Sequence, residues 1–390
     1  MIAHPLRVRM RPRAADEPGR VASPLELLVD LVFVVAVAQL VVQLAHAIEE
    51  GHLTETLLPF GMVFFAIWWA WMNFTWFASG YDTDDVPYRL LTMAQMGGVL
   101  VLAAGVPTAF EEGDFRAITI GYAIMRFALV IQWLRVAAST PEHRASALRS
   151  ALGFSLVQAG WLLRLLLPEQ FGVTSFLVLV ALELAVPLWA VRAGEPAWHP
   201  HHIAERYGLF TIILLGESVL AAVSGVQHAV TESGISASLV LVSACALVIV
   251  FALWWIYYLH PSGELLERRR DLSYLWGYAH FGIFAALGVL GSGLEAAVAA
   301  TSGHLETTEA VVGAAVAVPV AAFLLLLWAV HAPLRSESPV PARLVLPGAA
   351  VVLATPLLAE PFGVGGVLAA VALVSAGLVA VVVGSERVRA

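Results

Sequence analysis

The stretch ELLVDLVFVVAVAQLVVQLAHAI, from Glu26 to Ile48, decides the fold of this chain. After two acids near its start, Glu26 and Asp30, it contains no acid and no Arg. As a helix it is long enough to cross a hydrocarbon core of about 30 Å. Apolar blocks of similar length recur to the end of the chain. Lipid is therefore the expected solvent, and we expect an all-α, polytopic transmembrane helical bundle.

The composition agrees with this fold class. Of 390 residues, 60% are hydrophobic and 13% are charged, whereas soluble domains carry roughly 25% charged residues. The mean hydropathy is +0.84. The net charge of -8 comes from acids in short loops, and the sequence shows no basic patch for nucleic acid, no phosphate loop and no nucleotide fingerprint. We expect no cofactor and no nucleic-acid partner, and the single Cys245 excludes intrachain disulfides.

Hydropathy and Pro/Gly breaks divide the chain into about twelve spans. The eleventh span is short and holds Pro347 and Pro356, so we expect it to be re-entrant or kinked. The spans lie near 26–48, 56–78, 88–107, 116–136, 147–167, 172–191, 204–226, 235–259, 271–292, 308–330, 343–358 and 363–384.

The distribution of Arg predicts the orientation, because cytoplasmic loops are enriched in basic residues and this chain has no Lys. The loops on the other side are almost free of Arg, Arg116 being the exception. With twelve spans, both termini are expected in the cytoplasm of a bacterial cell, with the protein in its inner membrane. The Arg residues that fall on the predicted cytoplasmic side are Arg7, Arg9, Arg11, Arg13, Arg20, Arg135, Arg144, Arg149, Arg192, Arg206, Arg268, Arg269, Arg270, Arg335, Arg343, Arg387 and Arg389.

Three pairs of similar stretches indicate an internal repeat. ELLVDLVFVVAVAQL from Glu26 corresponds to ERYGLFTIILLGESV from Glu205, each with an acid at the start of an apolar helix. FAIWW (65–69) recurs as FALWW (251–255), and FGVTSFLVLVALELA (171–185) recurs as FGVGGVLAAVALVSA (362–376). We therefore expect two parallel six-helix repeats, related by a pseudo-two-fold axis along the membrane normal. The predicted domains are a cytoplasmic Arg-rich segment, 1–24, and the two repeats, 25–195 and 196–390.

Three stretches carry a resemblance to a known family: SPLELLVDLVFVVAVAQL (23–40), YDTDDVPYRLLTMAQM (81–96) and HHIAERYGLFTIILLGESVLA (201–221). Together they resemble the bacterial low temperature requirement protein A family. The resemblance implies a bacterial multipass membrane protein linked by name to growth in the cold, with no reaction attached. This chain has LLVD at 27–30, where the family often has an aromatic pair before the Asp.

A second similarity is to channels of lysosomes and bacteria that carry a Phe-Ser-Asp signature on the first helix of each six-helix repeat. VDLVFVVAVAQL (29–40) is similar in layout, with Asp30 in place of the signature Asp. Val29 replaces the Ser, and the second repeat has Leu209 opposite Asp30. Those channels conduct potassium or protons, which implies a pore along the corresponding helices here.

Four ionisable residues are expected near the middle of the membrane: Glu217, His280, Arg126 and Glu183. Each would cost on the order of 3 kcal/mol there without a partner or a hydrated cavity. We expect Arg126 to pair with Glu183 or Glu217, and His280 with Glu217 as a proton relay. All four should share one polar network, or at least Glu217, His280 and one of the other pair. The alternatives are pairs that only fix helix packing and a His280 satisfied within the core.

Further polar positions are expected along the pathway or at its cytoplasmic rim. Thr211, between Gly208 and Gly216, indicates either a helix break that binds an ion or close small-residue packing. The acids near the helix starts form either a ring around a cation vestibule or helix caps. The rim and pathway residues in question are Gln39, Glu26, Asp30, Glu205 and Arg206.

A loop after the second span adds Asp82, Asp84 and Asp85, followed by Arg89. We interpret it as a solvated loop or as added negative charge at the cytoplasmic mouth. His201 and His202 near Glu205 resemble half of a metal site, but no second cluster with ligand spacing follows, so no metal is predicted.

The leading functional hypothesis is an ion channel or ion-coupled transporter for protons, monovalent cations or a small solute. Two alternatives stay open. One is an integral membrane enzyme or lipid and cold-adaptation factor, and the other is an accessory scaffold for another membrane complex.

Overall fold

The computed structural model describes residues 6–14, 17–194, 197–259, 262–303, 305–332 and 341–389. Within these ranges every regular element is a helix, and no strand occurs. Arg335, one of the residues that predict the orientation, lies outside the described residues.

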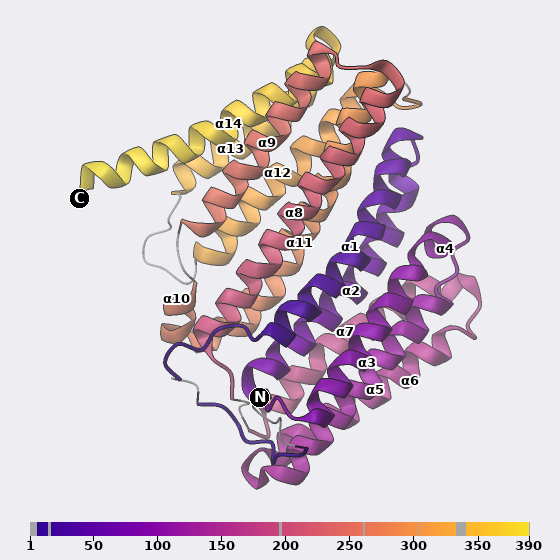
Figure 1. Ribbon diagram of the computed structural model, residues 1–390, viewed down its shortest axis with the longest axis vertical. Helices are drawn as coiled ribbons and strands as arrows, with labels where there is room; N and C mark the ends of the chain where they lie inside the picture. The colour runs from indigo at the N-terminus through magenta and orange to yellow at the C-terminus, as the bar shows by residue number, and fades with distance from the viewer. Residues whose placement is uncertain are drawn as a thin grey trace. The chain divides into compact units, whose positions relative to one another are not determined.

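The α-helices follow one another with short connections (Figure 1). Short 3-10 helices join several of them, at Pro141–His143, Glu169–Phe171, Arg270–Leu272, Ala300–Ser302 and Thr355–Leu358. The α-helices are α1 (Pro24–Glu49), α2 (Leu53–Tyr81), α3 (Val86–Ala104), α4 (Val106–Glu111), α5 (Arg116–Ser139), α6 (Arg144–Arg164), α7 (Gly172–Val191), α8 (Pro200–Ser233), α9 (Ala237–Tyr258), α10 (Gly263–Arg268), α11 (Ser273–Ala299), α12 (Glu309–His331), α13 (Ala342–Ala354) and α14 (Ala359–Arg389).

Each of the twelve predicted spans coincides with one helix, while α4 and α10 are short additional helices. By length and composition, ten helical segments of the described chain are suited to crossing a membrane. The number is lower than twelve because α13 and α14 run together as one apolar segment, Ala342–Gly384, and α6 is more polar, with Arg149 and Gln158 in its middle. The prediction of an all-α, multipass bundle is confirmed.

The region where the sequence predicted a kinked span contains a short helix, α13, and a break in the next helix, α14. α13 has 13 residues, which extend only about 20 Å. α14 breaks its helical geometry at Gly363, whose φ of 66° and ψ of -178° suit glycine. After this break the backbone N–H of Val364 donates to the Glu309 carboxylate, 2.9 Å away.

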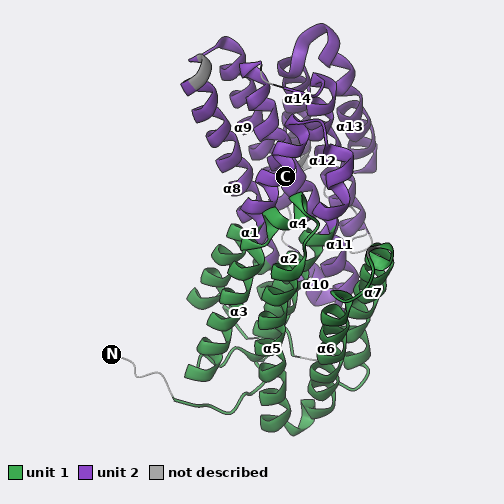
Figure 2. Cartoon of the chain, turned by 90° about the vertical axis from the view of Figure 1, so that its right-hand side faces the viewer, with its two compact units in different colours: residues 1–36, 62–206 green, residues 37–61, 207–390 purple. Residues whose placement is uncertain are grey.

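The helices group into two compact units (Figure 2). Unit 1 comprises Met1–Ala36 and Met62–Arg206, and unit 2 comprises Val37–Gly61 and Tyr207–Ala390, so α1 and α2 contribute to both. These units are groups of packed helices, whereas the domains 1–24, 25–195 and 196–390 are defined by sequence repetition. The repeat therefore stays a prediction.

In unit 1, neighbours along the chain pack together, α3 with α5, α5 with α6, and α6 with α7. α3 and α5 touch through their backbones at two glycines. A Cβ atom added to Gly98 would lie 2.6 Å from the carbonyl oxygen of Gly121 and 2.7 Å from Cγ of Met125. Only glycine allows helices to approach this closely.

Unit 2 also contains a close helix contact at a glycine. α11 packs on α12, α12 on α13 and α14, and α9 on α14. Gly293 of α11 lies against the backbone of Ala315 in α12, so that an added Cβ would clash with that carbonyl group. Small residues thus set the closest helix contacts in each unit.

Replacing Gly98 by Ala is expected to destabilise the protein by about 1–3 kcal/mol, because the new methyl group overpacks the α3–α5 contact. The adjacent Gly97 provides a matched control, since a Cβ there meets nothing within 4 Å. Gly97→Ala should be neutral or stabilising, because alanine favours the helix. Thermal unfolding of both variants in detergent measures the difference. Equal stability of the two variants would contradict the packing described.

Candidate functional site

The N-terminal residues 6–14 and 17–22 are not helical, and they pack against the helices of unit 1. The backbone N–H of Val8 donates to Asp85 over 2.9 Å. The hydroxyl of Thr140 donates to the carbonyl oxygen of Met10 over 2.7 Å, and the Met10 side chain is 1% exposed. This anchoring fixes the position of the residues that lead into α1.

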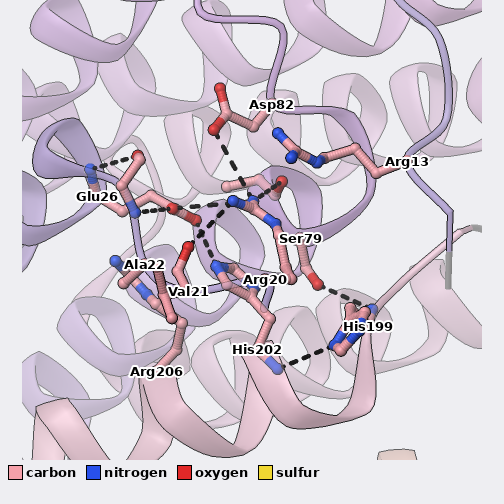
Figure 3. A network of polar contacts seen from close by, with 12 residues as sticks. Arg13, Arg20, Val21, Ala22, Glu26, Ser79, Asp82, His199, His202 and Arg206 are labelled. Carbon is pink, nitrogen blue, oxygen red and sulfur yellow. Dashed lines mark hydrogen bonds and ion pairs between the residues drawn. The ribbon is translucent and has the colours of Figure 1, made fainter. Parts of the chain in front are cut away.

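Arg20 of this segment reaches a buried group of acids (Figure 3). Its Nη2 lies 3.9 Å from Oε2 of Glu26, 3.8 Å from Oδ2 of Asp82 and 3.4 Å from the carbonyl oxygen of Ala78. Since the guanidinium is buried, these acids screen a charge that would otherwise be desolvated without compensation.

Glu26 caps α1 and also contacts α8. Its carboxylate accepts the N–H of Ser23 over 2.7 Å while the Ser23 hydroxyl accepts the N–H of Glu26 over 3.3 Å, which is a capping box. The other carboxylate oxygen lies 3.0 Å from Nε2 of His202. The structure shows the expected helix cap, and the same carboxylate is part of a buried group of charges, while the role of Glu26 at a cation vestibule stays a prediction.

Asp30, one turn further along α1, binds Arg206 of α8. Oδ1 of Asp30 accepts Nη2 of Arg206 over 2.7 Å and the indole N–H of Trp71 over 2.8 Å. Arg206 is fully buried and also lies 3.4 Å from the hydroxyl of Thr75. Oδ2 of Asp30 has no partner among the described residues, and neither do Nε and Nη1 of Arg206. Buried polar atoms of this kind require water or a ligand.

We call the group Arg20, Glu26, Asp30, Asp82, His202 and Arg206 the charge cluster of unit 1. It holds three acids and two Arg, so one negative charge is left for a proton or a bound cation to balance. Asp82 lies in the loop between α2 and α3. Burial, together with the neighbouring Glu26, raises the pKa of Asp82 to about 6.

The remaining rim and loop residues have defined partners. Glu205 accepts the N–H of Ala22 over 3.1 Å. The interpretation of 82–85 as a solvated loop is wrong for Asp85, which is fully buried, caps α3 by accepting the N–H of Tyr88, and binds Arg135 at 2.6 Å. The further pair in this loop is Asp84 with Arg89, at 2.7 Å.

A second buried charge pair lies deeper in unit 1. Arg126 of α5 donates to Glu183 of α7 over 2.7 Å, and both side chains are almost completely buried. The same carboxylate accepts the indole N–H groups of Trp69 and Trp161, over 2.8 and 3.1 Å, and the hydroxyl of Tyr122 over 3.3 Å. This carboxylate is fully satisfied, so the site fixes the packing of four helices. Arg126 pairs with Glu183, one of the two partners that the sequence predicted.

The predicted pair of His280 and Glu217 in unit 2 is not formed. His280 is fully buried and has other partners: the carbonyl oxygen of Trp276 lies 2.7 Å from its Nδ1, and the hydroxyl of Tyr257 lies 3.3 Å from its Nε2. The prediction failed because it measured depth along each helix separately. Tyr207 of α8 stacks near His280 of α11, whereas Ser218 lies beside Gly291. Glu217 is therefore about three turns, roughly 15 Å, further along than His280.

Glu217 itself is 5% exposed, and its Oε2 has no hydrogen-bond partner in the described part of the chain. The hydroxyl of Thr211 donates to the carbonyl oxygen of Tyr207, so it is occupied by its own helix. Gln39 is exposed. Of the predicted pathway residues in unit 2, Glu217 alone combines deep burial with a carboxylate oxygen that lacks a partner, within the described residues.

The two histidines considered as metal ligands have different surroundings. His202 contacts Glu26, as described above, and His201 is exposed with its ring 5.9 Å from that of His199. Among the described residues, no group of three or more His, Cys, Asp or Glu is arranged to hold a metal ion.

Sequence reasoning missed several residues of these sites. Trp69 and Trp71 were not predicted as site residues, yet their indole N–H groups bind buried carboxylates. Arg20 and Arg135 were counted only as orientation signals. A usable signal for the tryptophans was their position in an apolar helix, where an indole N–H needs an acceptor. The acids that accept from them could not be identified without the fold.

Asp82 predicts a pH dependence of stability. The folded protein keeps Asp82 protonated up to a pKa of about 6, whereas the unfolded chain releases this proton near 3.8. The folded state thus binds more protons in this range, so stability should fall as pH rises from 3.8 to about 6. Thermal unfolding of Asp82→Asn should show a smaller fall than the parent protein. Asp84→Asn is the control and should keep the parent's pH dependence, and an equal fall in all three would contradict the assignment.

Glu183→Gln should destabilise the protein by about 3–5 kcal/mol, because Arg126 would remain buried without a counter-charge. The double variant Arg126→Met/Glu183→Gln should recover part of this loss, since no unpaired charge is left. Glu112→Gln changes an exposed acid and serves as a control. Chemical or thermal unfolding in detergent provides the measurement, and a double variant no more stable than Glu183→Gln would show that the charge pair is not the cause.

Comparison with known proteins places these sites in a family. The family model described as bacterial low temperature requirement A protein matches residues 21–383. A protein of Rhizobium meliloti (strain 1021), described as uncharacterized, is 26% identical over 278 residues, which cover 67% of this chain and 66% of that protein. The chain thus spans just under two thirds of that relative. Because the family match extends over nearly the whole sequence, the chain belongs to the bacterial low temperature requirement A family.

Proposed function

We propose that this protein is an ion channel or ion-coupled transporter of the bacterial inner membrane. The observation that carries the proposal is Glu217, a carboxyl group in the middle of α8 with 5% exposure and an oxygen without a partner. An ionisable group at this depth is costly to keep, and ion or proton pathways are the usual setting for one. Arg126 and Glu183 differ, because their charges are matched and point to packing.

The order of helix contacts supports the duplicated architecture on which the proposal also rests. In unit 1, α3 packs on α5, α5 on α6 and α6 on α7, and in unit 2 the corresponding helices α11, α12, α13 and α14 pack in the same order. The repeated FGV sequence lies at a helix start both times. In the first copy α7 begins at Gly172, and in the second copy the regular part of α14 begins after the break at Gly363. Many transport proteins are built from such repeats.

The orientation is part of the same proposal, with both termini in the cytoplasm. It is supported by the Arg residues of the N-terminal segment and of the alternate loops that follow. Arg116 and Arg164, at the start of α5 and the end of α6, are the exceptions.

Purified protein in liposomes should carry protons, potassium or a small solute, and Glu217→Gln should remove most of this flux. Gln keeps the size of the side chain but can neither ionise nor take up a proton, so the loss would report on the charge. A pH-sensitive or ion-sensitive dye inside the liposomes measures the flux.

Glu360→Gln is the matched control, because it makes the same change at an exposed acid at the start of α14 and should leave the flux intact. Folded protein without flux in a broad screen of ions and solutes would contradict the proposal. That outcome would favour an enzymatic, lipid-adaptation or scaffold role.

A further inference from the structure

We propose that Glu217, Glu295 and Glu49 form a proton-binding chain in unit 2, which leads from the end of α1 to the buried middle of α8. The role of this chain of acids in transport rests on the proposed function. The inference extends that function by naming the proton as the ligand and two further acids as its carriers. The proton chain itself can be tested without any flux measurement.

The register of α8 and α11 places the first two acids on adjacent helices, with Glu295 five residues further along than Glu217. The two helices run in the same direction, since Ser218 lies beside Gly291 and Gly225 lies beside Val298. An added Cβ on Gly225 would also lie 3.5 Å from the carbonyl oxygen of Glu295. Helical side chains lean towards the N-terminal end of their own helix. Because both helices run in the same direction, both side chains lean the same way, and Glu295 stays roughly 7 Å further along than Glu217.

The surroundings of these two carboxyl groups contain no fixed positive charge within the described residues. Oε2 of Glu217 and Oε2 of Glu295 both lack a hydrogen-bond partner there. The charged groups close enough to act on Glu295 are Glu49 and Glu217, both acids. Two neighbouring carboxylates in a medium of low dielectric constant cannot both stay ionised without a counter-charge. At least one of the two therefore holds a proton.

The chain continues towards the surface at the end of α1. Glu49 is half-buried, and its carbonyl oxygen accepts the N–H of Glu306 over 3.0 Å, which fixes this end of the helix. His46 and His228 act on the Glu49 carboxyl group, and both are exposed. Exposure therefore decreases from the exposed histidines through the half-buried Glu49 and Glu295 to the buried Glu217. The titratable groups that face this region are His46, Glu49 and Glu50 on α1, Glu217 and His228 on α8, Glu295 on α11, and Glu306 after α11.

A proton fits this region better than a metal cation. A bare cation needs a shell of several oxygen ligands. The nearby hydroxyl groups of Ser218 and Ser292 donate to the backbone carbonyls of Leu214 and Val41. No group of three or more acids, His or Cys in the described chain is arranged around a common point for a metal. A proton needs only one carboxyl oxygen at a time, so Glu49, Glu295 and Glu217 can each take up and release one with no other chemical change.

Infrared spectroscopy of the full-length protein in lipid tests the proton-binding chain directly, because a protonated carboxyl group has a carbonyl band that an ionised one lacks. We expect the parent protein to keep such a band at a pH at which exposed carboxyl groups are ionised. Glu217→Gln and Glu295→Gln should each lose part of it. Glu360→Gln, an exposed acid, and Glu183→Gln, a buried acid paired with Arg126, should retain it in full.

Two outcomes would overturn the proposal. One is a band that neither Glu217→Gln nor Glu295→Gln changes, and the other is a band that sodium or potassium removes at constant pH, which would identify a metal cation as the ligand. Proton flux in liposomes should fall in Glu295→Gln and Glu49→Gln as well as in Glu217→Gln. If the bands are lost without any effect on flux, the proton site stands but takes no part in transport. If the parent protein shows the bands but no flux, the proton site stands and the transport function fails. If flux depends on Glu217 but neither the band nor the flux depends on Glu295, the transport function stands and the proposed chain of acids is wrong.

Discussion

The low dielectric constant of the membrane interior is the constraint on which the rest of this structure depends. A charge buried there is stable only with a partner, with water or as the neutral form of the group. The buried ion pairs of unit 1 follow this rule: Arg126 with Glu183, Arg206 with Asp30, and Arg135 with Asp85. Each pair joins segments far apart in the sequence, so charge neutralisation also fixes which helices lie together.

Tryptophan and tyrosine complete these pairs. A carboxylate has more acceptor sites than one guanidinium fills, and the indole N–H groups of Trp69, Trp71 and Trp161 occupy some of the remainder. The Glu183 carboxylate is thereby saturated, while that of Asp30 keeps one free oxygen beside Arg206. Nε and Nη1 of both Arg126 and Arg206 lack hydrogen-bond partners among the described residues, so the two sites differ in how completely the carboxylate is bound.

In unit 2 the buried ionisable groups have other kinds of partner. Its buried acids have no Arg partner among the described residues, and its buried His280 lies among aromatic rings with a backbone carbonyl as acceptor. A group that cannot be neutralised by a fixed charge must be neutralised by something mobile, and the smallest such species is a proton. The ion pairs of unit 1 compensate charge with fixed partners, whereas the proposal made above assigns a proton to the acids of unit 2.

The sequence by itself determined the helical class, the membrane setting, the approximate helix limits and the family, because hydrophobic length and recurring motifs are local properties. It also placed Arg126, Glu183 and Glu217 in the membrane, since an ionisable residue inside an apolar run is visible without a fold. Only the tertiary structure decided the partners. It paired Arg126 with Glu183, separated His280 from Glu217 and buried Asp85, because relative helix register depends on contacts such as Ser218 with Gly291 that no single helix contains.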